Sequence, residues 1–239
     1  KEWIEALKAG DYAKAFSKAI VTSRLTRPMI DDSKRLLQLL GIPFVQAPSE
    51  GEAQAAFIAC KGDVWAASSK DYDSLLFGAP RLVRFLTLTG KEYLPSKGSF
   101  RPLKPELIVL QEFLEKHGIT REQLVDLAIL VGTDFNRGVK GIGPKKALKL
   151  IETYEKLENM PDEIKIKLPT NYERVRRVFL EPDVYENYEI SYGGLQEEEI
   201  YHFLCRERDF SRKRIRTAVE RMKRFYSWTK QSDLKKWLC

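Results

Sequence analysis

Five carboxylates occur in three short motifs of a sequence whose net charge is positive. They are Glu50 and Glu52 in Ala-Pro-Ser-Glu-Gly-Glu, Asp71 and Asp73 in Lys-Asp-Tyr-Asp, and Asp134 in Gly-Thr-Asp-Phe-Asn. Five anions gathered in one cleft would raise one another's pKa values unless cations neutralised them. Hard divalent cations with oxygen ligands are the usual solution. The pattern therefore points to a metal-dependent enzyme that acts on a polyanion.

Each motif also has an ordinary explanation when it is taken alone. Ser49 and Glu52 have the spacing of a helix capping box, and the Asp-Tyr-Asp pair would suit a solvated turn. Asp134 would suit an Asx-type turn before Asn136. The prediction of a metal site therefore depends on the three motifs lying together in the fold.

The elements around these motifs predict an α/β core with a parallel sheet. Ile42–Gln46 has the pattern of a short apolar strand, and a helix that begins near Ser49 would carry both glutamates in its first turn. Val64–Ser68 predicts a second buried strand, after which the two aspartates at a spacing of two would share one face of extended chain. Asp134 follows an apolar helix over Leu124–Val131. Sites in α/β sheets lie at the carboxyl ends of parallel strands, which fits this order.

Further elements follow from hydrophobic periodicity and turn residues. We expect helices over Met29–Leu40 and Pro105–Phe113, and another that begins at Thr120. A strand over Arg81–Leu88 should form a hairpin with Lys91–Pro95.

Composition is that of a globular protein outside the membrane. The chain has 239 residues, of which 43% are hydrophobic and 31% charged, and it contains no apolar run near the roughly 18 residues that span a bilayer. These features predict a cytosolic or nuclear protein. Cys60, Cys205 and Cys239 lie far apart without metal-ligand spacing, so we expect reduced thiols.

The positive charge is concentrated in two stretches. Between Arg206 and Lys236 there are twelve Lys or Arg against four Asp or Glu, a net charge of +8 that exceeds the +7 of the whole chain. A second basic stretch without acids contains Arg137, Lys140, Lys145, Lys146 and Lys149. A solvated helix face is the alternative for the first stretch. The two together indicate nucleic acid as the partner.

The second basic stretch includes Gly141-Ile-Gly-Pro-Lys-Lys146, which predicts a helix-hairpin-helix element. Its two glycines allow a tight turn whose backbone amides can approach a phosphate. Pro144 suits the first turn of the next helix, where Lys145 would add positive charge. Such an element binds the duplex backbone without reading sequence. A simple helix-entry loop is the alternative.

These motifs, in this order, resemble the flap endonuclease family of structure-specific nucleases, most closely its archaeal members. The resemblance spans essentially the whole chain. It implies that Glu50, Glu52, Asp71, Asp73 and Asp134 hold two divalent cations, normally Mg²⁺ with Mn²⁺ as a substitute. It implies that the backbone carbonyls of Gly138, Val139 and Ile142 bind K⁺, although many members carry a hydroxyl residue where this chain has Gly138. The DNA-binding set would be Lys140, Gly141, Gly143, Lys145 and Lys146.

The resemblance also implies a fold and an activity. Residues 1–135 would form a PIN-like parallel-sheet nuclease core with the end of the arch helices, and residues 136–228 the helix-hairpin-helix and helical DNA-binding region. The activity would be cleavage of 5′ flaps, with 5′–3′ exonuclease activity, in DNA replication and repair in the archaeal cytoplasm. The partners would be double-stranded and 5′-flap DNA.

The sequence differs from the family pattern at its N-terminus. Members begin with a strand that bears an active-site aspartate, then a second aspartate and a basic arch helix, whereas Lys1 falls partway through that arch. We therefore expect an N-terminally incomplete core. A catalytically inactive fragment that binds DNA and a sliding clamp is the alternative function for these residues alone.

The last residues, 229–239, predict a clamp-binding tail. Leu234, Trp237 and Leu238 fall at i, i+3 and i+4 and form one apolar face of a helical turn. The segment is too short to be a stable helix by itself, so we expect it to fold on a partner. Together with Gln231 it resembles the motif that binds a clamp of the proliferating cell nuclear antigen type. A helix end docked on its own core is the alternative.

Overall fold

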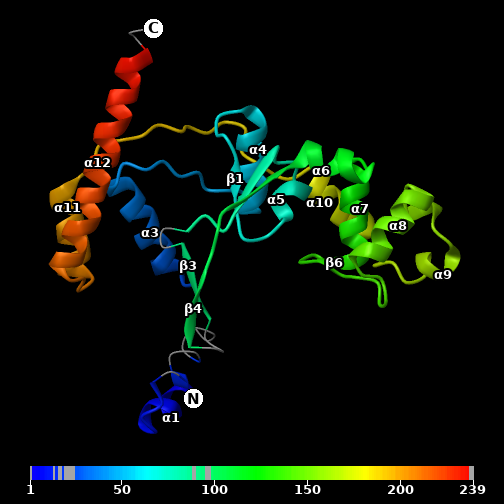
Figure 1. Cartoon of the computed structure of the whole chain (residues 1–239), viewed down its shortest axis with the longest axis horizontal. Helices are drawn as coiled ribbons and strands as arrows, with labels where there is room; N and C mark the ends of the chain where they lie inside the picture. Colours follow the sequence, from blue (N-terminus) through cyan, green and yellow to red (C-terminus); the bar gives the residue numbers. More distant parts are fainter. Residues whose placement is uncertain are drawn as a thin grey trace. The chain divides into compact units, whose positions relative to one another are not determined.

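The computed structural model describes residues 2–12, 14–15, 18, 25–87, 90–94 and 98–236, with side chains described as far as Ser227. The chain divides into two compact units. The central unit is Gln46–Glu186, and the terminal unit joins Lys1–Val45 to Asn187–Cys239. All five carboxylates of the predicted metal site lie in the central unit, whose elements are labelled in Figure 1.

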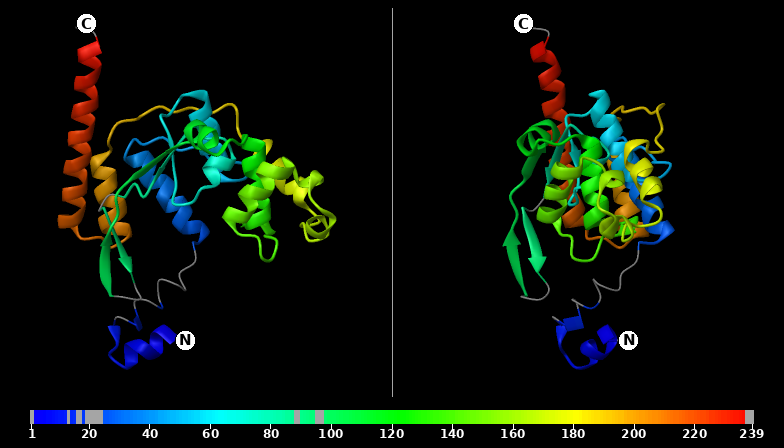
Figure 2. Two further views of the ribbon diagram at one scale, coloured as in Figure 1. Left: turned by 45° about the vertical axis from the view of Figure 1, so that its right-hand side comes forward. Right: turned by 90° about the vertical axis from the view of Figure 1, so that its right-hand side faces the viewer.

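The terminal unit is helical. Its elements are α1 (Glu2–Lys8), α3 (Arg27–Leu39), α11 (Glu197–Tyr201), the π-helical turn η2 (His202–Glu207) and α12 (Arg212–Lys236). Helix α11 packs on both α3 and α12, and α11 and α12 run side by side in Figure 2. Ile200, Phe203 and Val219 are almost completely buried at this contact. The basic helix α12 therefore contributes apolar residues, among them Ile215 and Val219, to a core.

A small mixed sheet organises the central unit. Its strands are β1 (Ala67–Ser68), β2 (Arg81–Arg84) and β5 (Glu106–Val109), in that order across the sheet. Strands β1 and β2 are parallel, whereas β5 is antiparallel to β2. The fold is thus mixed α/β, and the predicted all-parallel pairing holds only for β1 with β2. Helices α4 (Gly51–Lys61) and α5 (Asp73–Leu76) pack beside these two strands (Figure 1).

The other helices of the central unit follow the sheet. They are α6 (Leu110–His117), α7 (Arg121–Val131), α8 (Pro144–Tyr154), the 3₁₀ turn η1 (Leu157–Asn159), α9 (Asp162–Lys165) and α10 (Tyr172–Leu180). Helix α7 begins with a capping box in which Thr120 and Gln123 bond each other's backbone amides. It packs against α8 and α10, where Ile129, Leu130 and Phe179 are fully buried. Helix α7 is therefore the centre of this core.

The strand predicted over Ile42–Gln46 is wrong, and two other strands and one helix are wrong in part. The strand predicted over Val64–Ser68 is limited to Ala67–Ser68. Residues 42–47 follow an irregular path, because a strand needs a neighbour for its hydrogen bonds and the described strands pair with one another. The strand predicted over Arg81–Leu88 ends at Arg84, and Phe85 has a positive φ of 57°. The helix predicted from Pro105 is strand β5 followed by α6, since its Ile-Val segment pairs with β2.

The predicted hairpin of Lys91–Pro95 with Arg81–Leu88 is also wrong. Strand β3 (Lys91–Leu94) pairs instead with β4 (Ser99–Pro102), and the two form an antiparallel ribbon that is visible in Figure 2. The rings of Tyr93 and Phe100 contact each other across this ribbon at an interplanar angle of 57°, with centroids 5.2 Å apart. Within the described residues, each helix is too short or too polar to cross a lipid bilayer.

Candidate metal and DNA site

The start of helix α4 presents the first two carboxylates. Glu50 is the N-cap residue with extended backbone, and Glu52 lies in the first turn. The Ser49 capping box predicted from the sequence is therefore wrong. Glu52 instead accepts a hydrogen bond from the Ser74 hydroxyl at 3.3 Å, which links α4 to α5. Carboxylates at this end of a helix are stabilised by the helix dipole.

The next two carboxylates lie between β1 and α5. Asp71 is exposed in the loop, where its backbone N–H donates to Ser69 Oγ at 3.1 Å, and Asp73 is the first residue of α5. The predicted extended spacing is wrong, because the chain already turns into a helix at this point. The Phe77 N–H donates to the Asp73 carbonyl at 2.9 Å, which closes the first helical turn. The two side chains therefore converge through a turn and not through a shared strand face.

Asp134 occupies an exposed turn, as the sequence predicts. The turn joins strands β6 (Gly132–Thr133) and β7 (Asn136–Arg137) directly after α7. The side chains of Thr133 and Asn136 bond each other at 2.8 Å, and Asn136 Nδ2 donates to the Ile129 carbonyl at 2.9 Å. These contacts fix the turn to the end of α7, so Asp134 has a defined position.

The surroundings of Asp73 raise the pKa of its carboxyl group. This pKa is raised from 3.8 to about 6, first by burial and then by the charges of Glu52, Asp134, Asp71 and Glu50. Like charges with no cation between them favour separated side chains. Among the described residues, no three His, Cys, Asp or Glu side chains are grouped closely enough to hold a metal ion. An all-carboxylate donor set nonetheless has the chemistry that hard divalent cations require.

The raised pKa predicts a pH-dependent effect of Asp73→Asn without metal. Below the unfolded value of 3.8 Asp73 is protonated in both states, and as pH rises through about 6 the folded state loses stability because the carboxylate must ionise among like charges. Asp73→Asn should therefore raise the melting temperature at about pH 8 by several degrees and leave it nearly unchanged at about pH 4. Thermal unfolding in chelator measures both. Asp162→Asn on α9 is the control. An equal rise in the melting temperature of Asp73→Asn at both pH values would contradict the prediction.

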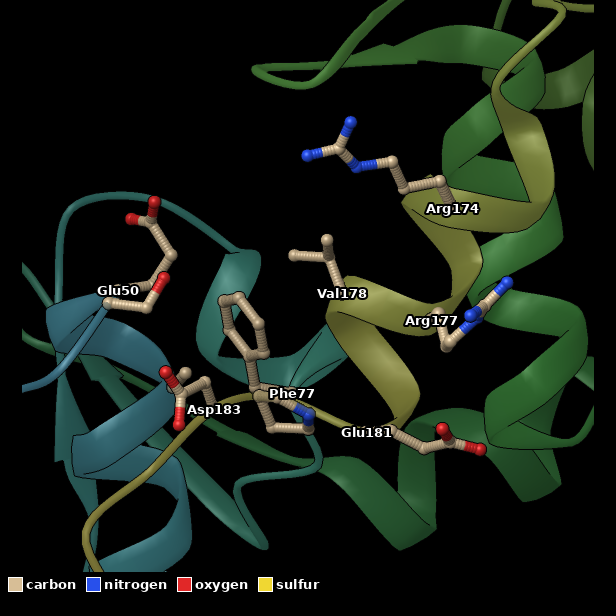
Figure 3. A pocket seen from close by; sticks show the side chains of 10 residues that line it. Glu50, Phe77, Arg174, Arg177, Val178, Glu181 and Asp183 are labelled. Atoms are coloured by element: carbon tan, nitrogen blue, oxygen red, sulfur yellow. The ribbon is translucent and has the colours of Figure 1, made fainter.

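A cavity of about 410 Å³ adjoins this acidic cluster. It lies between the start of α4 and helix α10, and its apolar side includes Ala53, Phe77 and Val178. Figure 3 shows Glu50 and Arg174 on opposite sides of this space. Five of its ten lining residues are charged, namely Glu50, Arg174, Arg177, Glu181 and Asp183, so it differs from the mostly apolar pockets that bind small ligands. The sequence interpretation missed Arg174, because the polar stretch around it has no motif.

The chain makes a tight turn before α8, at the position where the sequence predicts a hairpin. The Val139 N–H donates to the Leu130 carbonyl at 2.8 Å, and the Ile142 N–H donates to the Val139 carbonyl at 3.0 Å. Gly141 has a φ of +84°, which favours glycine. Gly143 is the N-cap of α8, and Pro144 opens the helix. The lysines predicted to bind DNA, Lys140, Lys145 and Lys146, are all exposed.

Gly138 is required by a close backbone approach. A Cβ atom at this position would lie only 1.9 Å from the Val131 carbonyl oxygen. A hydroxyl residue here would therefore need the backbone to move away from the end of α7. Tight packing at position 138 therefore accounts for the glycine that this chain has where many family members carry a hydroxyl residue.

The residues predicted to bind a clamp are only partly described. Helix α12 continues to Lys236, so the backbones of Gln231 and Leu234 are helical, whereas Trp237 and Leu238 lie outside the described residues. The expectation that residues 229–239 form a separate tail is therefore wrong for the backbone up to Lys236. The basic helix supplies the preceding turns, which lowers the cost of helix nucleation for these residues.

The chain resembles known proteins in both sequence and structure. Residues 41–134 match the XPG I-region family. The chain is 47% identical to flap endonuclease 1 of Staphylothermus marinus, over 99% of this chain and 69% of that protein. The solved structure of flap endonuclease-1 from Methanococcus jannaschii superposes with a TM-score of 0.70 at 42% identity, over 91% of this chain and 64% of that one.

A more distant solved structure shares the fold. It is the Holliday junction-resolving enzyme GEN1 in complex with product DNA and Mg²⁺, with a TM-score of 0.56 at 21% identity. The alignment covers 76% of this chain and 51% of that one.

Proposed function

The chain belongs to the flap endonuclease 1 family, and from this membership we propose that it carries catalytic carboxylates and a DNA-binding region of a structure-specific nuclease. The reaction is hydrolysis of a phosphodiester near the junction of a 5′ flap with duplex DNA, with 5′–3′ exonuclease activity, in DNA replication and repair. One observation carries the proposal. The start of α4, the start of α5 and the turn after α7 present five carboxylates within one compact unit of a chain whose net charge is +7.

The acidic cluster is the proposed site of two Mg²⁺ ions, for which Mn²⁺ substitutes. Glu50, Glu52, Asp71, Asp73 and Asp134 would hold them. When bound, such ions lower the pKa of a water molecule and offset the charge that develops on the phosphate. The hydroxyl that Ser74 donates to Glu52 orients one of these side chains. The magnesium in the related GEN1 structure supports this choice of ion.

The hairpin turn is the proposed DNA contact. Backbone amides at the start of α8, with Lys140, Lys145 and Lys146, would bind phosphates of the duplex. The carbonyls of Gly138, Val139 and Ile142 would hold K⁺. The Val139 carbonyl already accepts the Ile142 N–H, and its second lone pair is left for a cation. The DNA bound in the related GEN1 structure supports a nucleic-acid partner.

Replacing Lys145 and Lys146 together with Ala tests the DNA contact. We expect lower affinity for duplex and flap DNA, with a salt slope smaller by about one to two, because each lysine releases roughly one counterion from DNA. Titration of labelled DNA by fluorescence anisotropy at several salt concentrations measures the slope. Lys165→Ala with Lys167→Ala, two exposed lysines in and after α9, is the matched control. A slope equal to that of the unchanged protein would exclude the hairpin as a phosphate contact.

Cleavage of a 5′-flap substrate with Mg²⁺ tests the proposed reaction. It is measured for the 239-residue chain and for a protein of its relatives' full length that contains the chain. Cleavage that depends on Mg²⁺ is the expected result for the longer protein. Salt-dependent flap binding by both, with cleavage by neither, would favour the alternative of a DNA- and clamp-binding protein.

A sliding clamp is the second proposed partner. We expect a peptide of residues 231–239 to bind a clamp of the proliferating cell nuclear antigen type with micromolar affinity. Trp237→Ala should weaken this binding by about 2 kcal/mol or more, because a large aromatic anchor dominates small interfaces. Isothermal titration calorimetry measures both peptides, and Lys235→Ala is the control. Equal affinities for the unchanged peptide and the Trp237→Ala peptide would assign the segment to the fold of this chain.

A further inference from the structure

The loop that carries Asp71 is exposed, and a side chain of a neighbouring strand holds it. It spans residues 69–72, between β1 and α5. Within the loop, the Asp71 N–H donates to Ser69 Oγ at 3.1 Å. The charges that surround Asp73 include Asp71, so the carboxylates repel one another. Because the loop is exposed and its carboxylate is repelled, contacts with the sheet are needed to hold Asp71 in one position.

Arg84 provides that attachment from the neighbouring strand. It is the last residue of β2, which pairs in parallel with β1, the strand that leads into the loop. Its Nε and Nη2 both donate to the Lys70 carbonyl oxygen, at 3.0 and 2.9 Å. Its Nη1 donates to the Tyr72 hydroxyl at 2.5 Å, and the guanidinium lies 4.0 Å from the centre of the Tyr72 ring. One side chain therefore binds the residues on both sides of Asp71.

The guanidinium is itself held in place. Glu106 on β5, directly opposite Arg84 in the sheet, accepts a hydrogen bond from Nη1 at 3.2 Å. The Phe85 ring covers the guanidinium with its centroid 4.3 Å away, and only 12% of the Arg84 side chain is exposed. Lysine could not replace this residue, because a single ammonium lacks the planar fork that makes several bonds at fixed angles.

We propose that Arg84 is a positioning residue of the divalent-cation site, which fixes Asp71 by binding Lys70 and Tyr72. This role rests on the proposed function of the acidic cluster. Partners that orient metal ligands without touching the metal commonly change metal affinity by about 10- to 100-fold when they are removed. The expected consequence is that Arg84→Met weakens binding of a divalent cation by about 10- to 100-fold.

Titration of the 239-residue chain with Mn²⁺ tests the proposal without an activity assay. Calorimetry and electron paramagnetic resonance measure the Mn²⁺ affinity. Arg81→Met is the matched control, because Arg81 begins the same strand and makes the same kind of contact to a different loop. Its Nε donates to the Trp65 carbonyl at 2.8 Å, and its guanidinium lies 5.1 Å from the centre of the Trp65 ring. We expect Mn²⁺ affinity to fall in Arg84→Met and to stay nearly unchanged in Arg81→Met. Equal affinities in the two variants would overturn the proposal.

Arg84→Lys separates positioning from folding. It keeps the charge next to Glu106 but loses the fork, so we expect thermal stability near that of Arg81→Met with Mn²⁺ affinity still reduced. Hydrogen exchange of the Asp71 and Tyr72 amides should be faster in both Arg84 variants. Unchanged affinity and exchange in Arg84→Lys would refute the role of the fork. If the unchanged chain binds no Mn²⁺, the positioning role proposed for Arg84 in this chain is refuted, and flap cleavage by the longer protein tests the proposed function separately. If the unchanged chain binds Mn²⁺ and Asp71→Asn does not, the comparison of Arg84→Met with Arg81→Met decides the positioning role.

Discussion

Replacing Asp71 with Asn should lower the rate of Mg²⁺-dependent flap cleavage by more than about 100-fold in a protein of full family length that contains this chain. Residues that only orient metal ligands already account for about 10- to 100-fold, and the loss of a direct ligand should exceed that range. The amide keeps the shape of the side chain but removes the charge that attracts a divalent cation. Single-turnover cleavage with excess enzyme measures the rate of the chemical step.

The affinity for the flap substrate should be nearly unchanged in Asp71→Asn. The proposed phosphate contacts lie at the turn before α8, so Asp71→Asn should leave flap affinity in Ca²⁺ nearly unchanged. Asp162→Asn, an exposed aspartate on α9, is the control for a general effect of charge on DNA affinity. If affinity falls as far as the cleavage rate, Asp71 contacts substrate and the metal role is excluded.

Replacing Arg176 with Met should destabilise the central unit by about 3 to 5 kcal/mol, because it leaves a charge buried without its partner. Asp126 on α7 is 3% exposed, and Arg176 on α10 binds both of its carboxylate oxygens at 2.7 and 2.9 Å. Burial raises the pKa of Asp126, and the bonds from Arg176 lower it. Urea unfolding followed by circular dichroism measures the loss.

The pH dependence and a double variant identify the cause. Without Arg176 the pKa of Asp126 should rise further, so the loss of stability should shrink as the solution is acidified and Asp126 takes up a proton. Asp126→Asn combined with Arg176→Met should recover part of the stability, which a double-mutant cycle would report as coupling. Glu158→Gln is the control, since the second carboxylate bound by Arg176 is 42% exposed and should contribute less than about 1 kcal/mol. A loss for Arg176→Met that is constant with pH would point to packing.

The sequence predicted which side chains lie near Asp73 better than it predicted the local backbone conformation of their motifs. All five carboxylates lie within electrostatic reach of Asp73, although the reasons offered for two motifs were wrong. The Ser49 capping box and the extended Asp71–Asp73 pair are both replaced by helix starts. Short motifs at the ends of elements are compatible with several local conformations, and the packing of α4 and α5 on the sheet selects among them.

Strand assignments failed for a related reason. Ile42–Gln46 has the apolar pattern of a strand, and Glu106–Val109 follows a proline that suggested a helix start, yet only the second is a strand. Hydrogen-bond partners decide this, because β5 pairs along its length with β2 and residues 42–47 take an irregular path. Periodicity in one segment contains no information about which other segment will lie beside it.

The sequence by itself determined which residue types are available: carboxylates in three motifs, a glycine turn followed by lysines, and a basic C-terminal stretch. These follow from residue type and spacing alone. Only the tertiary structure decided that burial and four neighbouring charges act on Asp73, that Gly138 meets the Val131 carbonyl, and that Arg84 binds both neighbours of Asp71. Arg84 and Lys70 are distant in sequence and adjacent in space because β2 pairs with β1, and contacts of this kind arise only when the sheet has formed.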